Sequence, residues 1–133
     1  FWAKDYQQFC LIKKFASDLF PKISIQSLPI IREKNGLAMS SRNNYMNEEE
    51  INDSLNLYKT LLIVKDNMQA KAPIDLENLK TESKSIKWDY LEVLDAKNLM
   101  PISHKTKEII AAGAIRVNNK VRLIDNILWN SNV

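Results

Sequence analysis

Two stretches of the chain place apolar side chains at three- and four-residue steps, which is the spacing of a helix with one buried face. The first stretch begins at Asp5, a residue suited to cap a helix, and ends near Phe20, because Pro21 cannot continue it. Its apolar stripe consists of Phe9, Ile12, Phe15 with Ala16, and Leu19. The following segment 23–31, ISIQSLPII, is rich in β-branched residues and predicts a strand. A helix followed by a strand is half of an α/β unit whose earlier strands are missing.

The second helical stretch starts after Asn47, and Glu50 three residues later completes a capping-box pattern. Three consecutive glutamates, at 48–50, occupy the first turn. The helix dipole favours acidic residues there, so this run of charge needs no functional explanation. The predicted buried face consists of Ile51, Leu55, Tyr58, Leu62 and Met68. Asp75 then caps a short helix that ends near Ser83.

The last third of the chain changes from a helical to a strand-like pattern. The strand-like segments are 88–95, 108–117 and 120–125. Asn118 and Asn119 lie between the last two, and because asparagine tolerates positive φ, this pair predicts a tight hairpin. We therefore expect a three-stranded antiparallel sheet that packs against two helices.

These elements divide the chain into two predicted parts. Residues 1–42 hold one helix and one strand of an α/β domain, whereas residues 43–133 form a small α+β domain with a three-stranded antiparallel sheet and two or more helices. The composition, 45% hydrophobic and 26% charged, is that of a globular protein rather than a disordered one.

Charge and cysteine content narrow the expected partners and compartment. The formal net charge is +3, but lysine and arginine are spread without a consecutive block, so we expect no nucleic-acid partner. The single cysteine, Cys10, excludes an internal disulfide and favours a reducing, cytoplasmic compartment. The longest run of apolar residues and glycine, at 109–115, is far shorter than a membrane span. No signal peptide opens the chain, and it starts at Phe1 instead of methionine, which suggests a fragment of a longer protein.

The stretch GLAMSSRNNY, which begins at Gly36, carries the first candidate chemistry. Gly36 allows the backbone to turn or to approach a ligand closely. Ser40 and Ser41 offer hydroxyl and backbone N–H donors. Arg42 offers a rigid fork of donors suited to phosphate, and Arg32 could join it. Spacing alone favours a solvated surface turn, because short loops of serine and arginine are common.

The stretch KDYQQ, which begins at Lys4, carries the second. Lys4 and Asp5 flank the start of the first helix, where anions bind readily, and Gln8 lies one turn further. Taken singly, a solvated lysine, a capping aspartate and surface glutamines explain these residues better than a binding site does.

Together the two stretches resemble one family of enzymes. F-x-x-KDYQQ, with REKNGLAMSSRNNY starting at Arg32, resembles the pantothenate synthetase (pantoate–β-alanine ligase) family. VRLIDN at 121–126 also resembles that family's C-terminal hairpin. The order and spacing of the first two motifs agree without gaps, and the likeness covers essentially the whole chain.

The resemblance implies an ATP-dependent ligase of pantothenate biosynthesis in the cytoplasm. Such an enzyme joins pantoate to ATP as pantoyl adenylate, releasing pyrophosphate, and β-alanine then displaces AMP. Mg²⁺ accompanies the ATP, and no residue of this chain is expected to ligate it. Residues 1–42 would be the C-terminal end of a Rossmann-like, adenylyltransferase-like nucleotide-binding domain, and residues 43–133 a lid. The N-terminal half of family members is missing here, and a homodimer of the full-length protein would form through that half.

The resemblance also implies roles for individual residues. Lys4 would contact the phosphates, Asp5 the ribose or nearby groups, and Gln8 the pantoate. Ile31 would meet the adenine through its backbone. The mobile loop over the triphosphate would consist of Met39, Ser40, Ser41 and Arg42. The groups that stabilise the departing pyrophosphate, and so act catalytically, would be Lys4, Ser40, Ser41 and Arg42.

Two features depart from the family pattern. Trp2 and Ala3, which fall among the expected nucleotide-binding residues, stand where the family usually has Gly-Glu. Trp2 would stack on the adenine, obstruct it, or point away from it without effect. The ATP-binding His-x-Gly-His signature is absent, and the single histidine, His104, is expected at the surface. The chain would then hold only part of an active site and be inactive alone. A non-catalytic interaction or lid domain is the alternative, and a nucleic-acid-binding module is a weaker one.

Overall fold

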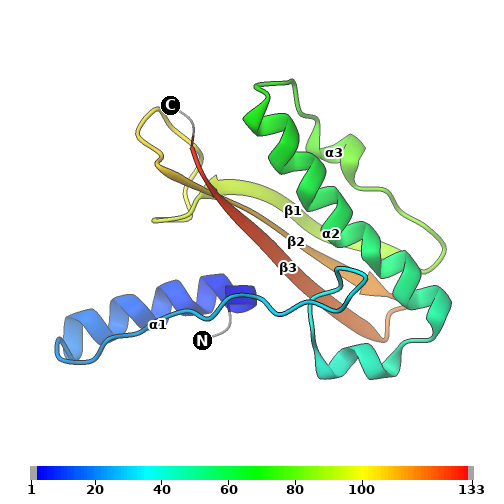
Figure 1. Ribbon diagram of the computed structural model, residues 1–133, viewed down its shortest axis with the longest axis horizontal. Helices are drawn as coiled ribbons and strands as arrows, with labels where there is room; N and C mark the ends of the chain where they lie inside the picture. The colour runs from blue at the N-terminus through cyan, green and yellow to red at the C-terminus, as the bar shows by residue number, and fades with distance from the viewer. Residues whose placement is uncertain (1–2, 132–133) are drawn as a thin grey trace.

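A computed structural model describes residues 3–131, and its centre is a three-stranded antiparallel sheet (Figure 1). The strands are β1 (Ile86–Asp95), β2 (Glu108–Val117) and β3 (Val121–Asn130), in the order β1-β2-β3. The sequence prediction of this sheet is confirmed, although β1 begins two residues earlier and β3 ends five residues later than predicted. The additional pairs, such as Ile109 with Trp129, lengthen the hairpin ladder.

The turn between β2 and β3 follows directly from its two asparagines. Asn118 and Asn119 have φ of 49° and 57°, and the backbone N–H of Lys120 donates to the Val117 carbonyl at 3.0 Å. Two successive positive φ values are what a tight hairpin turn requires, so the prediction is confirmed. Asn118 also donates to the buried carboxylate of Glu50 at 2.6 Å, which ties the turn to the neighbouring helix.

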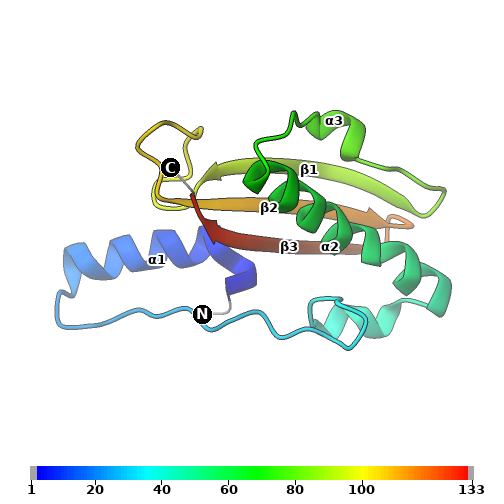
Figure 2. The same ribbon diagram turned by 45° about the horizontal axis from the view of Figure 1, so that its top comes forward.

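The helix α2 (Glu48–Gln69) lies across one face of β2 and β3 and closes the core (Figure 2). Its capping box is formed as predicted, by Asn47 and Glu50. The residues of the helix that are buried almost completely are Leu57, Leu61 and Val64, with Glu50, Ser54 and Thr60. The buried face is therefore rotated from the predicted stripe, whose members Ile51, Leu55 and Met68 pack only at its edges.

The predicted and observed faces differ because polar residues of the helix are buried. Ser54 is fully buried because its hydroxyl donates to the Glu50 carbonyl one turn earlier at 2.6 Å, so no hydrogen bond is lost on burial. A hydropathy pattern counts such a serine as exposed. The short helix after Asp75 is confirmed as α3 (Leu76–Leu79), but it is a single turn and stops before the predicted end near Ser83.

The helix α2 and the sheet form one packed module. The N-terminal arm, residues 3–31, contrasts with this module, because its helix α1 (Tyr6–Leu19) extends away from the sheet (Figure 1). The helix itself is confirmed, and Phe9 and Ala16 of the predicted stripe are buried. The prediction that the whole stripe is buried is wrong for Phe15 and Leu19, which are exposed. Asp5 is the N-cap by position, but its side chain accepts no capping hydrogen bond, so that part of the prediction is also wrong.

The strand predicted over 23–31 is not formed. This segment is extended, but it pairs with no strand of the described sheet, and Ile23, Leu28 and Ile31 are exposed. β-Branched residues favour an extended backbone, but a strand also needs a neighbour to pair its N–H and C=O groups. Among the described residues, no helix has the length and the apolar character that crossing a bilayer requires.

Candidate functional site

The loop that carries the serines and Arg42 begins with a small hairpin. Arg32 and Ala38 form an isolated antiparallel bridge, and the N–H of Met39 donates to the Ile31 carbonyl at 2.9 Å. Leu37 and Ala38 are buried against the core, whereas Met39 is half exposed. The hairpin thus presents Met39 and the residues after it to solvent from a fixed base.

Gly36 makes the turn of this hairpin possible. Its φ is +95°, a conformation that side-chain-bearing residues rarely adopt, and a Cβ atom there would lie 2.8 Å from the ring of Tyr58. The sequence left open whether Gly36 serves a turn or the approach of a ligand. The structure uses it for a turn that packs closely against α2.

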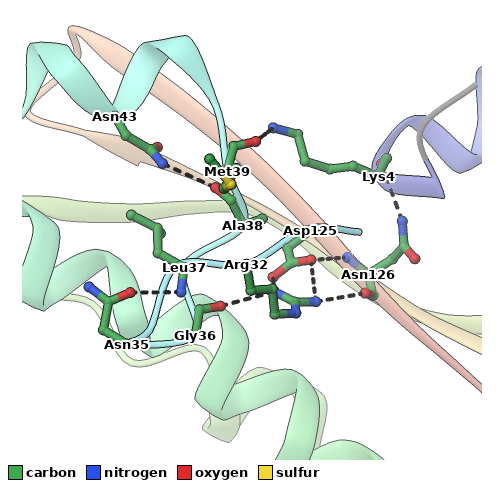
Figure 3. A network of polar contacts seen from close by, with 10 residues as sticks. All are labelled: Lys4, Arg32, Asn35, Gly36, Leu37, Ala38, Met39, Asn43, Asp125 and Asn126. Atoms are coloured by element: carbon green, nitrogen blue, oxygen red, sulfur yellow. Dashed lines mark hydrogen bonds and ion pairs between the residues drawn. The ribbon is translucent and has the colours of Figure 1, made fainter. Parts of the chain in front are cut away.

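Arg32 does not join the phosphate-type donors of the loop, contrary to the sequence interpretation. Its guanidinium forms a two-pronged ion pair with Asp125 of β3, at 2.6 and 2.9 Å, and donates to the Gly36 carbonyl at 3.1 Å. It also stacks 3.8 Å from the centre of the Tyr58 ring. Burial raises the pKa of Asp125, and Arg32 opposes that shift by favouring the ionised carboxylate. Figure 3 shows the contacts of Arg32 with Asp125 and with the Gly36 carbonyl, which commit Arg32 to holding the hairpin on β3.

Lys4 faces the loop from the start of the N-terminal arm. Its ammonium donates to the Met39 carbonyl at 3.4 Å, and its own carbonyl accepts from the side chain of Asn126 at 3.2 Å (Figure 3). Burial lowers the pKa of Lys4; nearby Asp5 and Asp125 oppose this shift, and Arg42 adds to it. A partly buried cation of this kind gains from an anionic ligand placed against it.

A cavity of about 510 Å³ lies between Lys4 and the loop. It is lined by Lys4, Asp5, Ile30, Ile31, Glu33, Met39, Ser40, Ser41 and Asn44. The structure therefore brings together six of the residues that the sequence singled out, which are Lys4, Asp5, Ile31, Met39, Ser40 and Ser41. The lining combines apolar side chains with one cation, two carboxylates and two hydroxyls, which is the mixed lining typical of small-molecule sites.

Gln8 and Arg42 lie outside this cavity. Gln8 lines a neighbouring cavity of about 580 Å³, which it shares with Lys4, Arg122 and Asp125. The guanidinium of Arg42 donates to the Arg122 carbonyl at 3.2 Å and lines neither cavity. The positive charge of Arg42 nevertheless adds to the lowering of the Lys4 pKa that burial causes.

Comparison with known proteins places the chain in a family. Residues 1–128 match the family model described as pantoate-beta-alanine ligase. The chain belongs to the pantoate-beta-alanine ligase family. It is 44% identical to the pantothenate synthetase of Vesicomyosocius okutanii over 97% of this chain and 46% of that protein. It is 38% identical to the enzyme of Thermosipho africanus over 96% of this chain and 48% of that protein.

Solved structures of the family agree with this fold. The pantothenate synthetase of Thermus thermophilus superposes with a TM-score of 0.85 at 30% identity, over 96% of this chain and 48% of that one. The ligase of Francisella tularensis, solved with β,γ-ATP and β-alanine, gives a TM-score of 0.64 at 30% identity, over 95% of this chain and 41% of that one. The chain thus spans about half the length of the curated ligases that it matches.

The sequence interpretation of this ligase-family chain missed Asp125 and Asn126 as site-building residues. They were noticed only as part of the VRLIDN likeness, although both are 3% exposed and contact Arg32 and Lys4. An acidic residue inside an apolar strand was the available signal, since aspartate is rarely buried without a partner. The partner itself, 93 residues away in the sequence, left no local trace.

The remaining predictions for the ligase-family chain concern its first residues and metal binding. Trp2 lies outside the described residues, and Ala3 belongs to the short helix η1 (Ala3–Asp5) that leads into α1. His104 is exposed in a turn, as expected. Within residues 3–131, no group of three or more His, Cys, Asp or Glu side chains is placed to hold a metal ion.

Proposed function

We propose that this chain is the C-terminal part of an ATP-dependent pantothenate synthetase, which condenses pantoate with β-alanine through pantoyl adenylate and releases AMP and pyrophosphate. The observation that carries the proposal is the single cavity lined by Lys4, Ser40 and Ser41 together with Ile31 and Met39. The family match over residues 1–128 supports the same conclusion.

The proposed chemistry is positioning and charge neutralisation. When the pantoate carboxylate attacks the α-phosphorus, negative charge grows on the α-phosphate and on the leaving pyrophosphate. The ammonium of Lys4 and the hydroxyls of Ser40 and Ser41, which line one cavity, would stabilise that charge. The adenine would lie against Ile31 and Met39, where the Ile31 carbonyl accepts one hydrogen bond from Met39 and keeps a second lone pair.

Arg42 would act after a change of position. Its side chain is exposed, and its guanidinium donates a hydrogen bond of 3.2 Å to the Arg122 carbonyl, which costs little to break. We propose that it turns onto the pyrophosphate when nucleotide binds, as a mobile loop residue does. Gln8 would hold pantoate, and Asp5 the ribose.

The two-part division is also a proposal. Residues 43–133 would act as a lid over the nucleotide-binding part, of which α1 and the extended segment 23–31 would be a Rossmann-like remnant. The ion pair of Arg32 with Asp125 and the burial of Leu37 in the core support attaching the loop 32–42 to the lid rather than to the part that precedes it.

The rest of the site would come from the half that precedes these residues in longer family members. That half would cover the exposed apolar side chains of α1, contribute the remaining ATP and pantoate contacts, and form the homodimer. We expect Mg²⁺ to be held by the phosphates and water, as this ion usually is, because residues 3–131 offer it no cluster of ligands.

The test uses the full-length protein that carries these residues, with ATP, pantoate and β-alanine. Arg42→Ala should lower pyrophosphate release by roughly two to three orders of magnitude, the cost of one transition-state donor. Arg116→Ala is the matched control, because Arg116 is an exposed arginine that pairs with Asp89 and lines neither cavity.

Pyrophosphate release at the wild-type rate in Arg42→Ala would contradict the role of Arg42. Absence of pantothenate from the full-length wild-type protein would contradict the proposed function and favour a non-catalytic interaction domain. The 133-residue chain alone should form no pantothenate, and product above background would show that it needs no other half.

A further inference from the structure

Two sides of the proposed nucleotide site are attached to consecutive residues of β3. On one side, the Asn126 side chain donates to the Lys4 carbonyl at 3.2 Å. On the other, Asp125 holds Arg32, which begins the hairpin that ends at Met39. Lys4 and Met39 are 35 residues apart in the sequence. They lie near each other because both are attached to β3.

We infer that Asp125 and Asn126 are positioning residues, which set the separation between Lys4 and the loop at Met39–Ser41 and thereby the rate of adenylation. This inference rests on the proposed function. Asp125 and Asn126 also line the larger cavity beside Gln8, but the role inferred for them is to act through Lys4 and the loop.

The contacts of Asp125 are those of a rigid support. The carboxylate is 3% exposed and accepts both prongs of the Arg32 guanidinium, at 2.6 and 2.9 Å, and the N–H of Asn126 at 2.8 Å. A planar fork bound in this way has one orientation, which a single hydrogen bond would not impose. Tyr58 covers the open face of the guanidinium.

These contacts form a closed circuit (Figure 3). It runs from Lys4 to Asn126, along the backbone to Asp125, across to Arg32, through the bridged hairpin to Met39, and back to Lys4. The direct link from the Lys4 ammonium to the Met39 carbonyl is long, at 3.4 Å, and comes from a flexible side chain. The position of the loop therefore depends on β3 more than on Lys4.

Such a support matters for rate because a misplacement of about 1 Å at a reacting centre can cost about 100-fold. A pair that served stability alone would behave differently. Its loss would lower the melting temperature, but a folded variant would keep the wild-type kcat.

The experiment compares two truncations at buried positions of the full-length enzyme. Asn126→Ala removes the donor to Lys4, whereas Val64→Ala removes apolar contact from the far part of α2, where the side chain is 0% exposed. Pyrophosphate release gives kcat and the KM for ATP at a temperature well below both melting points. Amide hydrogen exchange at residues 39–41, without substrate, reports the order of the loop.

We expect Asn126→Ala to lower kcat by about 10- to 100-fold with a much smaller change in KM, and to speed exchange at residues 39–41. Val64→Ala should lower the melting temperature and leave kcat and loop exchange unchanged. Arg32→Lys, which keeps the charge but loses the fork, should also lower kcat, and it serves if Asn126→Ala does not fold.

A folded Asn126→Ala or Arg32→Lys enzyme with wild-type kcat would overturn the inference. Failure of the proposed function would look different, because the wild-type enzyme itself would then release no pyrophosphate. In that case unchanged loop exchange in the variants would still overturn the positioning role, and faster exchange confined to residues 39–41 would support it.

Discussion

Two regions of the molecule carry the same kind of apolar pattern but differ in how far it is buried. One region is the module formed by α2 and the sheet, and the other is the N-terminal arm. In the module, Leu61 and Ile115 are 0% exposed, because α2 and the sheet cover each other. In the arm, Phe15 and Leu19 of α1 are 59% and 58% exposed. Helical periodicity therefore predicts an apolar face, but it does not tell which segment will cover that face.

The loop at 32–42 joins these two regions and resembles the module more than the arm. Leu37 belongs to the core cluster, and Arg32 is fixed to Asp125. The segment 23–31, directly before it, pairs with no strand of the described sheet, and its Ile23, Leu28 and Ile31 are exposed. The region that closes its own core thus begins near Arg32, which is why the candidate site has one rigid wall.

The largest expected difference between the two regions comes from truncating one apolar side chain in each. Leu61→Ala should lower the free energy of unfolding of the 133-residue chain by about 2–5 kcal/mol, because it leaves a cavity in the core. Phe15→Ala should change it by less than about 0.5 kcal/mol, since that side chain is largely in water. Urea denaturation of both variants measures the difference. Equal losses would show that α1 is packed in solution.

A change at the boundary between the two regions should have an intermediate effect. Gly36→Ala is expected to destabilise the chain by about 1–3 kcal/mol, because the new Cβ would press on the Tyr58 ring and the backbone at φ +95° would be strained. Lys34→Ala, at an exposed position of the same hairpin, is the control. Thermal unfolding monitored by circular dichroism compares them, and similar melting temperatures would contradict the tight packing of the turn.

The smallest expected effect concerns how the stability of the module depends on pH. Hydrogen bonds from Lys120, Asn47 and Asn118 lower the pKa of Glu50 to about 2 from its ordinary 4.5. Because the folded-state pKa is depressed, the carboxylate stabilises the module above pH 4.5, and this contribution is lost as the pH falls toward 2. Glu50→Gln should flatten the dependence of melting temperature on pH in that range. Glu49→Gln, exposed in the same turn, should not.

Local rules are enough to predict several elements of the ligase-family chain. The capping box at Asn47 and Glu50 and the turn at Asn118 and Asn119 depend on residues at most a few positions apart, so their sequence determines them. The buried face of α2 is predicted less accurately. Ser54 is polar and is therefore expected at the surface, but its hydroxyl has a partner within the helix, so the residue can be buried.

The sequence predicts which residues belong to the candidate site better than it predicts how they are arranged. Lys4, Ser40 and Ser41 were singled out by residue type and resemblance, and one cavity brings them together. Arg32 was expected among the phosphate donors, but it pairs with Asp125. A guanidinium has the same donors in either role, so residue type alone cannot choose between them.

The sequence by itself determined the helices, the three strands, the hairpin turn and the residues that could bind phosphate. Each of these depends on backbone preference, on hydrophobic period or on contacts within one turn. Only the tertiary structure decided that the segment 23–31 would stay unpaired with the sheet, which side of α1 would be exposed, and that β3 would support both Lys4 and the loop. Those outcomes join residues as far as 122 positions apart, as Asn126 and Lys4 are, and depend on the path of the whole chain between them.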